Sequence, residues 1–467
     1  MKSEITLPGA ELKTALSGLN KITGRKTSLP VLSHLKVTRE KNGQVSLQGT
    51  DLDAFATYRL EGSQPGEPVE LLVPMEQLNQ AFKANTSRQE MTLLCDGAVT
   101  KLRYRLGDNP IEQPVNTLPV DEWPPAPQLT GESAPLPPGF GEALKQAFVC
   151  CSDSRPVLQG ACLDARDKSG HYIVASNGLM LYAANSFNFP FAGSLTIPAS
   201  KFLTGTGLLD ADVCFLSVQP GKKKNDVKRI SLRNQRWEFV TREVEGPFPE
   251  WKQHLVKLDD RWTRIQLKPE AVASLLKVIP NLPGKDGQHQ VVSLRVDKVL
   301  TVAGRNQSDT EPTQVDINDV VITGKAKNIS LNREYLLNAL RFGFDEVAVL
   351  DELSPLVISQ AGRQMVIMPV NPNGSPTPGS APQTPTAPKP EAQAPTERKT
   401  AMSETTKTAG PNALDQTETI KTKLRELLGD LNDLTGLLKQ ADKDKRTTEK
   451  EVASVRQTIR SLQGVKI

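Results

Sequence analysis

The chain has 467 residues and a mass of 51.0 kDa, which is enough for two to four domains at about 100 to 200 residues each. Hydrophobic residues make up 37%, charged residues 24% and aromatic residues 5%, a balance typical of a soluble protein with mainly aliphatic cores. No run of about 18 apolar residues could cross a bilayer, and the first residues, MKSEITLPGAELK, lack the apolar stretch of a signal peptide. We therefore expect a cytoplasmic location.

Side chains that build metal or disulfide sites are few and scattered. The five cysteines are an odd number and include no CxxC pair, so neither a disulfide framework nor a zinc site is predicted. The four histidines show no HxxxH or HxH spacing, which argues against a zinc centre or a Ser/His/Asp group. We expect reduced thiols and no metal or organic cofactor. The residues concerned are Cys95, Cys150, Cys151, Cys162, Cys214, His34, His171, His254 and His289.

The formal net charge of +4 is not concentrated in one basic block. Residues 413–467 contribute +2 and residues 371–412 contribute +1, which leaves +1 for residues 1–370. A protein that coats nucleic acid without specificity normally carries a basic excess. Any DNA contact made by residues 1–370 must therefore come from a polarised distribution of charge.

The clearest boundary in the chain is compositional. Residues 371–395 contain 8 prolines and too few apolar side chains to offset the entropy of ordering. Residues 371–412 are thus predicted to be a disordered linker rich in proline and threonine.

The tail that follows, residues 413–467, has apolar residues spaced alternately four and three apart, which is typical of a coiled coil. The middle of this seam is poor, because Lys445 and Thr448 fall at core positions. One long helix and a helical hairpin that turns near residues 441–447 both fit the pattern. The seam begins with Ile420, Leu424, Leu427, Leu431, Leu434 and Leu438.

Residues 1–370 contain an internal repeat. Short amphipathic helices are predicted at ELKTALSGL, EALKQAF and EAVASLL, and each is followed by strands with period-two alternation. A second helix follows in each copy, at VPMEQLNQAF, IPASKFL and ISLNREYLLNAL. The first two copies also end alike, in LPVDEWPP and GPFPEW. The pattern predicts an α+β protein with three related domains, at residues 1–130, 131–260 and 261–370.

Several motifs of the body resemble those of the bacterial DNA polymerase III beta sliding clamp family. They are GRKTSLPVLSHLKV, VSLQGTDLDAFATYRL, SRPVLQGACLDA, IVASNGLMLYA, GPFPEW and the terminal MVIMPV. Their order, spacing and threefold repetition make the resemblance specific, and it spans essentially all of residues 1–370. It implies the processivity fold, in which two three-domain chains close head to tail into a homodimeric ring with sheets outside and helices lining the hole.

The resemblance also implies a function. Duplex DNA would pass through the ring, bound without sequence specificity through its phosphates. The ring would tether the DNA polymerase III catalytic subunit for processive synthesis and would catalyse nothing. Basic residues that could face DNA are Lys13, Arg25, Lys26, Lys83, Lys145, Arg155, Lys201, Lys277, Arg333 and Arg341.

A second site implied by the resemblance is a hydrophobic groove between the second and third domains. It would take short peptides from the polymerase, the clamp loader and other replication or repair proteins, because apolar side chains can desolvate leucine and phenylalanine anchors. The family's usual aspartate-glycine-histidine-arginine run reads Asn177, Gly178, Leu179 and Met180 here, and Asn371 replaces a basic residue. The matching groove positions are Leu158, Ser176, Gly178, Leu181, Pro249, Val366, Met368, Pro369 and Val370.

The same resemblance predicts the contact that closes the ring. Tyr104 of one copy would meet Val278 and Ile279 of the other. An apolar patch at these positions would otherwise be an exposed liability.

Two other functions remain open at this point. Asp51 and Asp53 lie two apart on one face of a predicted strand and could in principle hold a metal, although no histidine or third acid is near. The chain could also be a clamp-derived adaptor that recruits partners through its groove and helical tail without serving the main replicase. For the tail itself, tethering of a partner, covering of the groove and self-association are all compatible with the sequence.

Overall fold

The computed structural model describes residues 2–370, apart from residues 24–28, 87–88, 97–98, 128, 130–131, 168–169, 220–227, 288 and 307. The predicted linker at 371–412 and the helical tail at 413–467 lie outside the described residues. The described residues all belong to one compact unit, so the boundaries at 130, 260 and 370 stay a prediction. We use them only to name a first, a second and a third segment.

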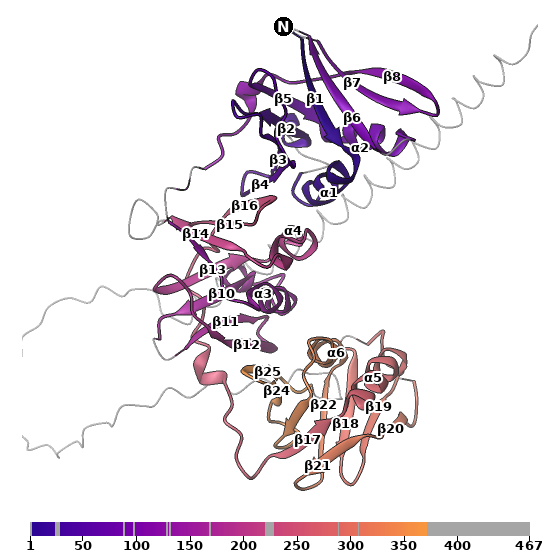
Figure 1. Ribbon diagram of the computed structural model, residues 1–467. Coiled ribbons are helices and arrows are strands. Elements are labelled where there is room, and N and C mark those ends of the chain that lie inside the picture. Colours follow the sequence, from indigo (N-terminus) through magenta and orange to yellow (C-terminus); the bar gives the residue numbers. More distant parts are fainter. Residues whose placement is uncertain are drawn as a thin grey trace, which may run out of the picture. The chain divides into compact units, whose positions relative to one another are not determined.

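The first segment contains two helices, one four-stranded sheet and half of an eight-stranded sheet (Figure 1). Helix α1 begins directly after a strand, and its apolar residues Leu12, Leu16 and Leu19 are buried at the spacing of one helix face. The elements are β1 (Lys2–Pro8), α1 (Gly9–Leu19), η1 (Pro30–Ser33), β2 (His34–Arg39), β3 (Val45–Thr50), β4 (Ala54–Arg59), β5 (Val69–Pro74), α2 (Met75–Ala84), β6 (Glu90–Asp96), β7 (Val99–Leu106), β8 (Asn109–Val115) and η2 (Val120–Glu122).

The second segment repeats this order of elements. Its shorter second helix, α4, is capped by Ser200, whose hydroxyl accepts the N–H of Phe202 at 3.2 Å. The elements are β9 (Ser133–Pro135), α3 (Phe140–Val149), η3 (Pro156–Leu158), β10 (Gly160–Ala165), β11 (His171–Ser176), β12 (Met180–Phe187), β13 (Gly193–Pro198), α4 (Lys201–Gly205), η4 (Leu208–Asp210), β14 (Phe215–Gln219), β15 (Arg229–Arg233), β16 (Trp237–Arg242) and η5 (Lys252–His254).

The third segment follows the same order, with five strands instead of four between its two helices. Its second helix, α6, is capped by Asn332, whose side-chain oxygen accepts the N–H of Glu334 at 2.9 Å. The elements are β17 (Thr263–Leu267), α5 (Pro269–Val278), η6 (Ile279–Asn281), β18 (Val291–Val296), β19 (Leu300–Gly304), β20 (Thr313–Ile317), β21 (Val320–Thr323), β22 (Lys327–Asn332), α6 (Arg333–Arg341), β23 (Glu346–Val349), β24 (Leu356–Gln360) and β25 (Arg363–Ile367). The α+β prediction and the predicted helix pairs are confirmed.

The sheets continue from one segment into the next. An eight-stranded sheet, β5-β2-β3-β4-β16-β15-β14-β9, joins the first and second segments through β4 and β16. A nine-stranded sheet, β13-β10-β11-β12-β25-β24-β23-β17-β21, joins the second and third through β12 and β25. Two four-stranded sheets remain at the ends, β1-β6-β7-β8 in the first segment and β20-β19-β18-β22 in the third.

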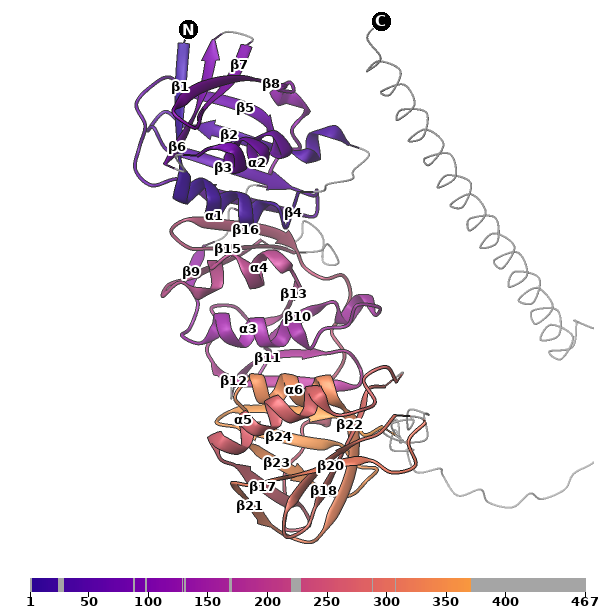
Figure 2. The same cartoon turned by 90° about the vertical axis from the view of Figure 1, so that its right-hand side faces the viewer.

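The helices of all three segments lie on the same side of the sheets in both views (Figures 1 and 2). The main core lies between this helix layer and the sheets. At the first junction a Cβ atom on Gly18 of α1 would lie only 2.5 Å from the ring of Trp237 on β16. Glycine therefore lets α1 pack directly against the second segment.

Candidate partner groove and DNA-facing helices

The predicted groove surrounds the junction of β12 and β25. Leu181 on β12 pairs with Val366 on β25 in the antiparallel register. The N–H of Met368 donates to the carbonyl of Leu179 at 2.8 Å, and the N–H of Val370 donates to the carbonyl of Ser330 at 2.8 Å. The end of the third segment is thus bound both to the second segment and to β22 in the end sheet of the third segment.

The turn between β11 and β12 presents Gly178 and Leu179 to solvent. The Asn177 side-chain oxygen accepts the N–H groups of Leu179 and Met180, each at 2.9 Å, and the Ser176 hydroxyl donates to the carbonyl of Met180 at 2.7 Å. Gly178 has φ +90°, which favours glycine. Leu179 is 46% exposed, so an apolar side chain stands at the rim of the predicted groove.

This turn also contacts the third segment. The Asn177 amide donates to the hydroxyl of Tyr335 on α6 at 3.1 Å. Since Tyr335 belongs to the third segment and Asn177 to the second, the hydrogen bond ties the two sides of the predicted groove together. The sequence pattern did not reveal this link, because the two residues are 158 positions apart.

Arg155, predicted to face DNA, lies beside the same turn. A Cβ atom on Gly178 would be 2.3 Å from a terminal nitrogen of the Arg155 guanidinium, so the guanidinium lies directly over the glycine. Arg155 is exposed, and the buried Leu158 follows it by three residues. The structure therefore places one cation at the groove, although Leu179 and Met180 replace the family's usual histidine and arginine.

The apolar part of the predicted groove is largely buried within the chain. Leu181 and Val366 belong to a cluster with Cys162, Val174, Ala183 and Trp251 that we call the outer cluster, because it is separate from the main core beneath the helices. Leu158, Leu181, Val366 and Pro369 are buried, Ser176, Met368 and Val370 are half-buried, and Gly178 and Pro249 are exposed. The connector that leads from β16 to β17 lies over this cluster and contributes Phe248, Trp251, Leu255 and Val256.

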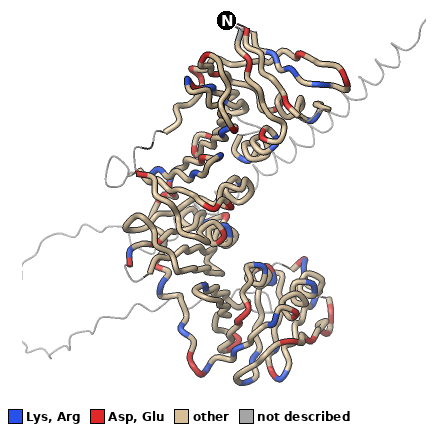
Figure 3. The backbone as a smooth tube through the Cα atoms, in the orientation of Figure 1, with Lys and Arg blue, Asp and Glu red and all other residues tan. Residues whose placement is uncertain are grey.

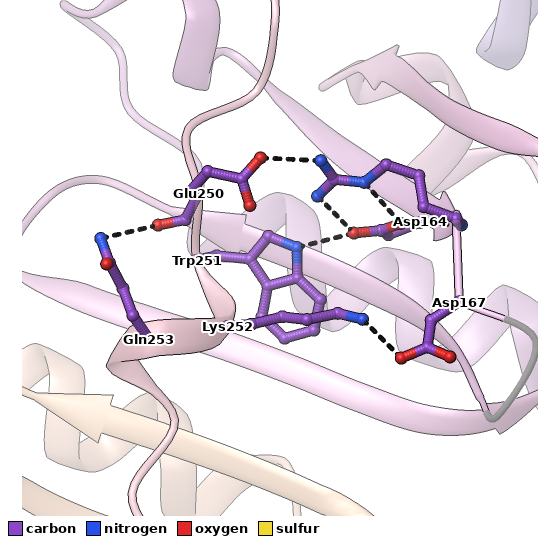
Figure 4. Close-up of polar contacts among 7 residues, drawn as sticks. Asp164, Asp167, Glu250, Trp251, Lys252 and Gln253 are labelled. Atoms are coloured by element: carbon purple, nitrogen blue, oxygen red, sulfur yellow. Dashed lines mark hydrogen bonds and ion pairs between the residues drawn. The ribbon is translucent and has the colours of Figure 1, made fainter.

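A charged network anchors the connector to the sheet of the second segment (Figure 4). The Trp251 indole N–H donates to the Asp164 carboxylate at 3.0 Å, and Arg166 donates to both oxygens of that carboxylate at 3.0 and 2.8 Å. Arg166 also donates to Glu250 at 2.8 Å. Burial would raise the pKa of Asp164, but the hydrogen bonds from Arg166 and Trp251 outweigh burial and hold that pKa below its usual value.

Lys252 makes a second contact between the connector and the sheet, which Figure 4 also shows. Its ammonium lies 3.1 Å from the Asp167 carboxylate and over the ring of Tyr172. The Tyr172 ring in turn packs on Trp251, with ring centroids 4.9 Å apart. The motif GPFPEW pointed to this tryptophan as a repeated feature, and its partner Asp164 lies in the motif SRPVLQGACLDA, but nothing in the sequence linked the two residues.

A cavity of about 410 Å³ lies beyond the outer cluster, between the connector and β12–β25. Ala183 and Asn185 of β12 line it, on the same strand face as Leu181 because side chains alternate along a strand. Tyr172, Lys252 and Val256 also line it. None of the nine predicted groove residues lines this cavity, so the sequence did not predict it.

The predicted DNA-facing cations lie mostly on the helix layer. Lys13, Lys83, Lys201, Lys277 and Arg341 are exposed on α1, α2, α4, α5 and α6. Lys145 on α3 is half-buried and forms an ion pair with Asp210. Arg25 and Lys26 lie outside the described residues.

Acidic residues are mixed with these cations along the chain (Figure 3). Five of the described helices carry a glutamate in their first turn, which suits the helix dipole: α1, α2, α3, α5 and α6. The helix layer is therefore only mildly basic. This agrees with the nearly neutral charge of residues 1–370.

One predicted DNA contact is wrong. Arg333 is only 2% exposed, and its guanidinium donates to the carbonyls of Leu282 at 2.8 Å and of Ile279 at 3.3 Å. Burial lowers the pKa of Arg333 below that of a free arginine. Its side chain holds η6 against α6 and is not available to phosphates.

The predicted ring contact is only partly accessible. Tyr104 on β7 and Val278 on α5 are half-buried. Ile279 has no exposed surface and belongs to the main core, so its side chain cannot meet a second copy. For Ile279 the prediction is wrong, because the chain passes from α5 into η6 at this residue and its side chain packs in the main core.

Asp51 forms a turn like that of Asn177. Its carboxylate accepts the N–H groups of Asp53 at 3.1 Å and Ala54 at 2.8 Å. Burial and then the neighbouring Asp53 charge raise the pKa of Asp51, against the backbone hydrogen bonds. Within the described part of the chain, no group of three or more His, Cys, Asp or Glu side chains could hold a metal, and no helix is long and apolar enough to cross a membrane.

No family model matches the chain. The beta sliding clamp of Salmonella typhimurium is 24% identical over 365 residues, which cover 74% of this chain and 94% of that protein. The beta sliding clamp of Escherichia coli K12 gives the same identity and coverage.

Solved structures agree with the sequence relatives. The DNA polymerase sliding clamp of Bacillus subtilis superposes with a TM-score of 0.66 at 18% identity and covers 79% of this chain and 99% of its own. The DNA polymerase III beta subunit of Thermotoga maritima gives a TM-score of 0.65 at 18% identity, with 79% and 100% covered. The resemblance inferred from the sequence is thus confirmed, and the described part of the chain has the fold of the bacterial DNA polymerase III beta subunit, the beta sliding clamp.

Proposed function

We propose that this chain is a DNA sliding clamp, in which two copies close head to tail around duplex DNA and hold the replicative polymerase on its template. The clamp acts by topology and catalyses no reaction. Its partners are double-stranded DNA, the DNA polymerase III catalytic subunit, the clamp loader and other replication or repair proteins. Its location is the cytoplasm, in association with the nucleoid.

The observation that carries this proposal is the way the sheets join. Neighbouring segments merge their sheets through β4 with β16 and through β12 with β25. Only the two end sheets lack such a merger in the described structure, and their end strands are β1 and β8 in the first segment and β20 and β22 in the third. A second copy placed head to tail brings these two ends together at both junctions, which closes a ring with three segments from each chain.

Charge at the two ends supports a head-to-tail contact. In the first segment β7 carries Lys101, Arg103 and Arg105, and β8 carries one acid, Glu112, which forms ion pairs with Lys101 and Arg103. The two strands together keep a positive net charge. In the third segment, the acidic residues Asp309, Glu311, Asp316 and Asp319 lie in and beside β20. Opposite charges on the two ends favour contact between different ends of two copies over contact between like ends.

The helix layer supplies a surface that could contact DNA weakly and without sequence specificity. Its exposed cations are spread over five helices of all three segments and are interspersed with acids. Phosphate contacts of this kind carry no base information, so the ring should move along the duplex.

The test is retention on circular DNA. The full chain is incubated at high concentration with a nicked plasmid, and the complex is isolated by gel filtration before and after a single restriction cut. We expect the protein to elute with the circle and to be lost after the cut, because a ring slides off free ends. Equal retention on circular and linear DNA would reject the ring and leave an ordinary DNA-binding adaptor.

A matched pair of variants tests the DNA-facing surface. Lys13→Ala, Lys201→Ala and Lys277→Ala together should weaken retention and lower the slope of log affinity against log salt by about 1 per contact removed. The control removes Lys36, Arg242 and Arg295, which alternate with core residues on their strands and so point away from the helices. An equal loss in both triple variants would mean that charge alone, and not the helix layer, retains the DNA.

A further inference from the structure

Strand β8 is one of the two end strands of the first segment's end sheet, the other being β1, and it carries two prolines within its span. Pro110 and Pro114 are the second and sixth of its seven residues. In the other strands that the structure describes, any proline is the last residue. Proline has no N–H group and is confined to the edges of sheets.

The pairing of β8 with β7 fixes the direction in which these prolines face. The register is continuous and places Pro110 opposite Arg105 and Pro114 opposite Lys101. In an antiparallel pair, residues alternate between hydrogen-bonded and non-hydrogen-bonded positions. Because proline cannot donate to β7, Pro110 and Pro114 occupy the non-hydrogen-bonded positions, together with Glu112 between them. The backbone groups of these three residues therefore face the free edge.

Along that edge the N–H of Glu112 is the one donor left among three positions. An antiparallel strand added to β8 would bring a carbonyl toward each of the three, and two of these carbonyls would meet a proline ring. Buried carbonyls without partners are costly. Prolines are also one of the devices that keep sheet edges from pairing. The β8 edge is thus blocked against strand addition.

Side chains next to this edge offer a different contact. Leu106, at the end of β7, is 48% exposed. It shares a strand face with the half-buried Tyr104, which stands opposite the half-buried Ile111 on β8. These three residues form an apolar strip beside the blocked edge.

We propose that the two copies of this chain are joined by side-chain packing on the Tyr104–Leu106–Ile111 strip, without a main-chain ladder through β8. This inference rests on the proposed ring, and its occupant is the third segment of a second copy, whose acidic end complements the positive net charge that β7 and β8 keep after Glu112 pairs with Lys101 and Arg103. A junction without a ladder is weaker and opens more readily than the merged sheets inside the chain.

The experiment measures self-association of the full chain by sedimentation equilibrium, for the wild type and three variants. Pro110→Thr with Pro114→Thr restores two N–H donors at the edge and should tighten the dimer about tenfold or more, since two net hydrogen bonds are gained. Pro135→Thr is the matched control, because it removes an exposed proline from another end strand, β9. This variant should leave the dissociation constant of the dimer unchanged. Leu106→Asp should weaken the dimer at least about tenfold.

Hydrogen exchange of the wild type supplies a readout that does not depend on any variant. The amide of Glu112 should exchange equally fast in monomer and dimer. Each of three results would overturn the inference while the ring stands. They are protection of this amide on dimerisation, an unchanged dimer dissociation constant in the double proline variant, and an unchanged dimer dissociation constant in Leu106→Asp. Absence of self-association in the wild type and in the double proline variant would overturn both the inference and the ring.

Discussion

Two tryptophans end the first two segments in similar motifs, and the structure gives them different surroundings. Trp123 donates its indole N–H to the side-chain oxygen of Gln48 at 3.0 Å. It packs in a small cluster whose members all belong to the first segment, among them Leu32 and Leu72. Trp251 donates instead to the carboxylate of Asp164 and packs in the outer cluster, which contains Val366 of the third segment.

The comparison shows how one repeated element acquires two roles. Around Trp123 the connector is fixed to its own segment by a hydrogen bond between neutral groups. Around Trp251 the connector is fixed to the second segment by a charged network, and its indole packs in a cluster that includes Val366 of the third segment. Hydrogen bonds to ionised groups are about twice as strong as neutral ones. The second junction, where the groove is predicted, therefore depends on its connector more than the first does.

The largest expected effect follows from removing each tryptophan in turn. Trp251→Ala should lower the free energy of unfolding by about 3–5 kcal/mol, as is typical for a buried tryptophan. It should also weaken binding of a peptide with leucine and phenylalanine anchors by about tenfold or more, because the outer cluster loses its centre. Trp123→Ala, measured by the same urea unfolding and fluorescence polarisation, should cost stability but leave peptide affinity unchanged. Equal peptide affinities of the two variants would contradict the claim that Trp251, and not Trp123, supports the predicted groove.

A smaller effect is expected from the partner of each indole. Asp164→Asn should lower the free energy of unfolding by about 1–3 kcal/mol, because it leaves Glu250 as the one carboxylate bound to the guanidinium of Arg166. Gln48→Leu should lower the free energy of unfolding by about 1 kcal/mol, which is the typical net contribution of a hydrogen bond between neutral groups.

The pH dependence sharpens this difference. The pKa of Asp164 is lower in the folded protein than in the unfolded chain, where it is about 3.9. Its contribution to stability is therefore fully present above the unfolded pKa and is lost as the pH falls through the folded pKa. Asp164→Asn should flatten the decline of stability below about pH 4, whereas Gln48→Leu should leave it unchanged. Identical pH profiles for Asp164→Asn and the wild type would contradict this assignment.

The turns next to the two clusters give the third prediction. Leu179 is 46% exposed at the second junction, and Leu52 is 42% exposed in the equivalent turn of the first segment. Leu179→Asp should weaken binding of the peptide with leucine and phenylalanine anchors by about 1–2 kcal/mol, or about 5- to 30-fold in affinity, through loss of apolar contact. Leu52→Asp is the control and should bind as the wild type does. A loss shared by both variants would point to a general effect of charge.

The smallest effect concerns the bond across the second junction. Tyr335→Phe removes the hydroxyl that accepts from Asn177 and should cost about 0.5–1.5 kcal/mol. Asn177→Ala combined with Tyr335→Phe should show a coupling energy in a double-mutant cycle of unfolding free energies. Strict additivity would mean that the bond contributes nothing to the junction.

Features with a local period were predictable from the sequence. The helices at Leu12, Leu144 and Val272 and their following strands were identified because burial of one face repeats every 3.6 or 2 residues. The repeated EW ending also drew attention to both tryptophans. The family resemblance then supplied the fold that joins these elements.

Features made by distant residues were not predictable. Arg333 reads as an exposed cation at the start of a helix, but it donates to the carbonyls of Ile279 in η6 and of Leu282 just after η6, more than 50 residues earlier. Ile279 reads as a surface apolar residue, although η6 turns it inward. The pairings of Asp164 with Trp251 and of Tyr335 with Asn177 gave no signal, because the partners are 87 and 158 residues apart.

The most direct test of the ring is a mass and image of the full chain in solution. Light scattering at high micromolar concentration, with electron micrographs of the same sample, should give twice the chain mass of 51.0 kDa and particles with a central hole wide enough for duplex DNA. A mass of one chain at every concentration, with no ring among the particles, would contradict the clamp and leave only its fold.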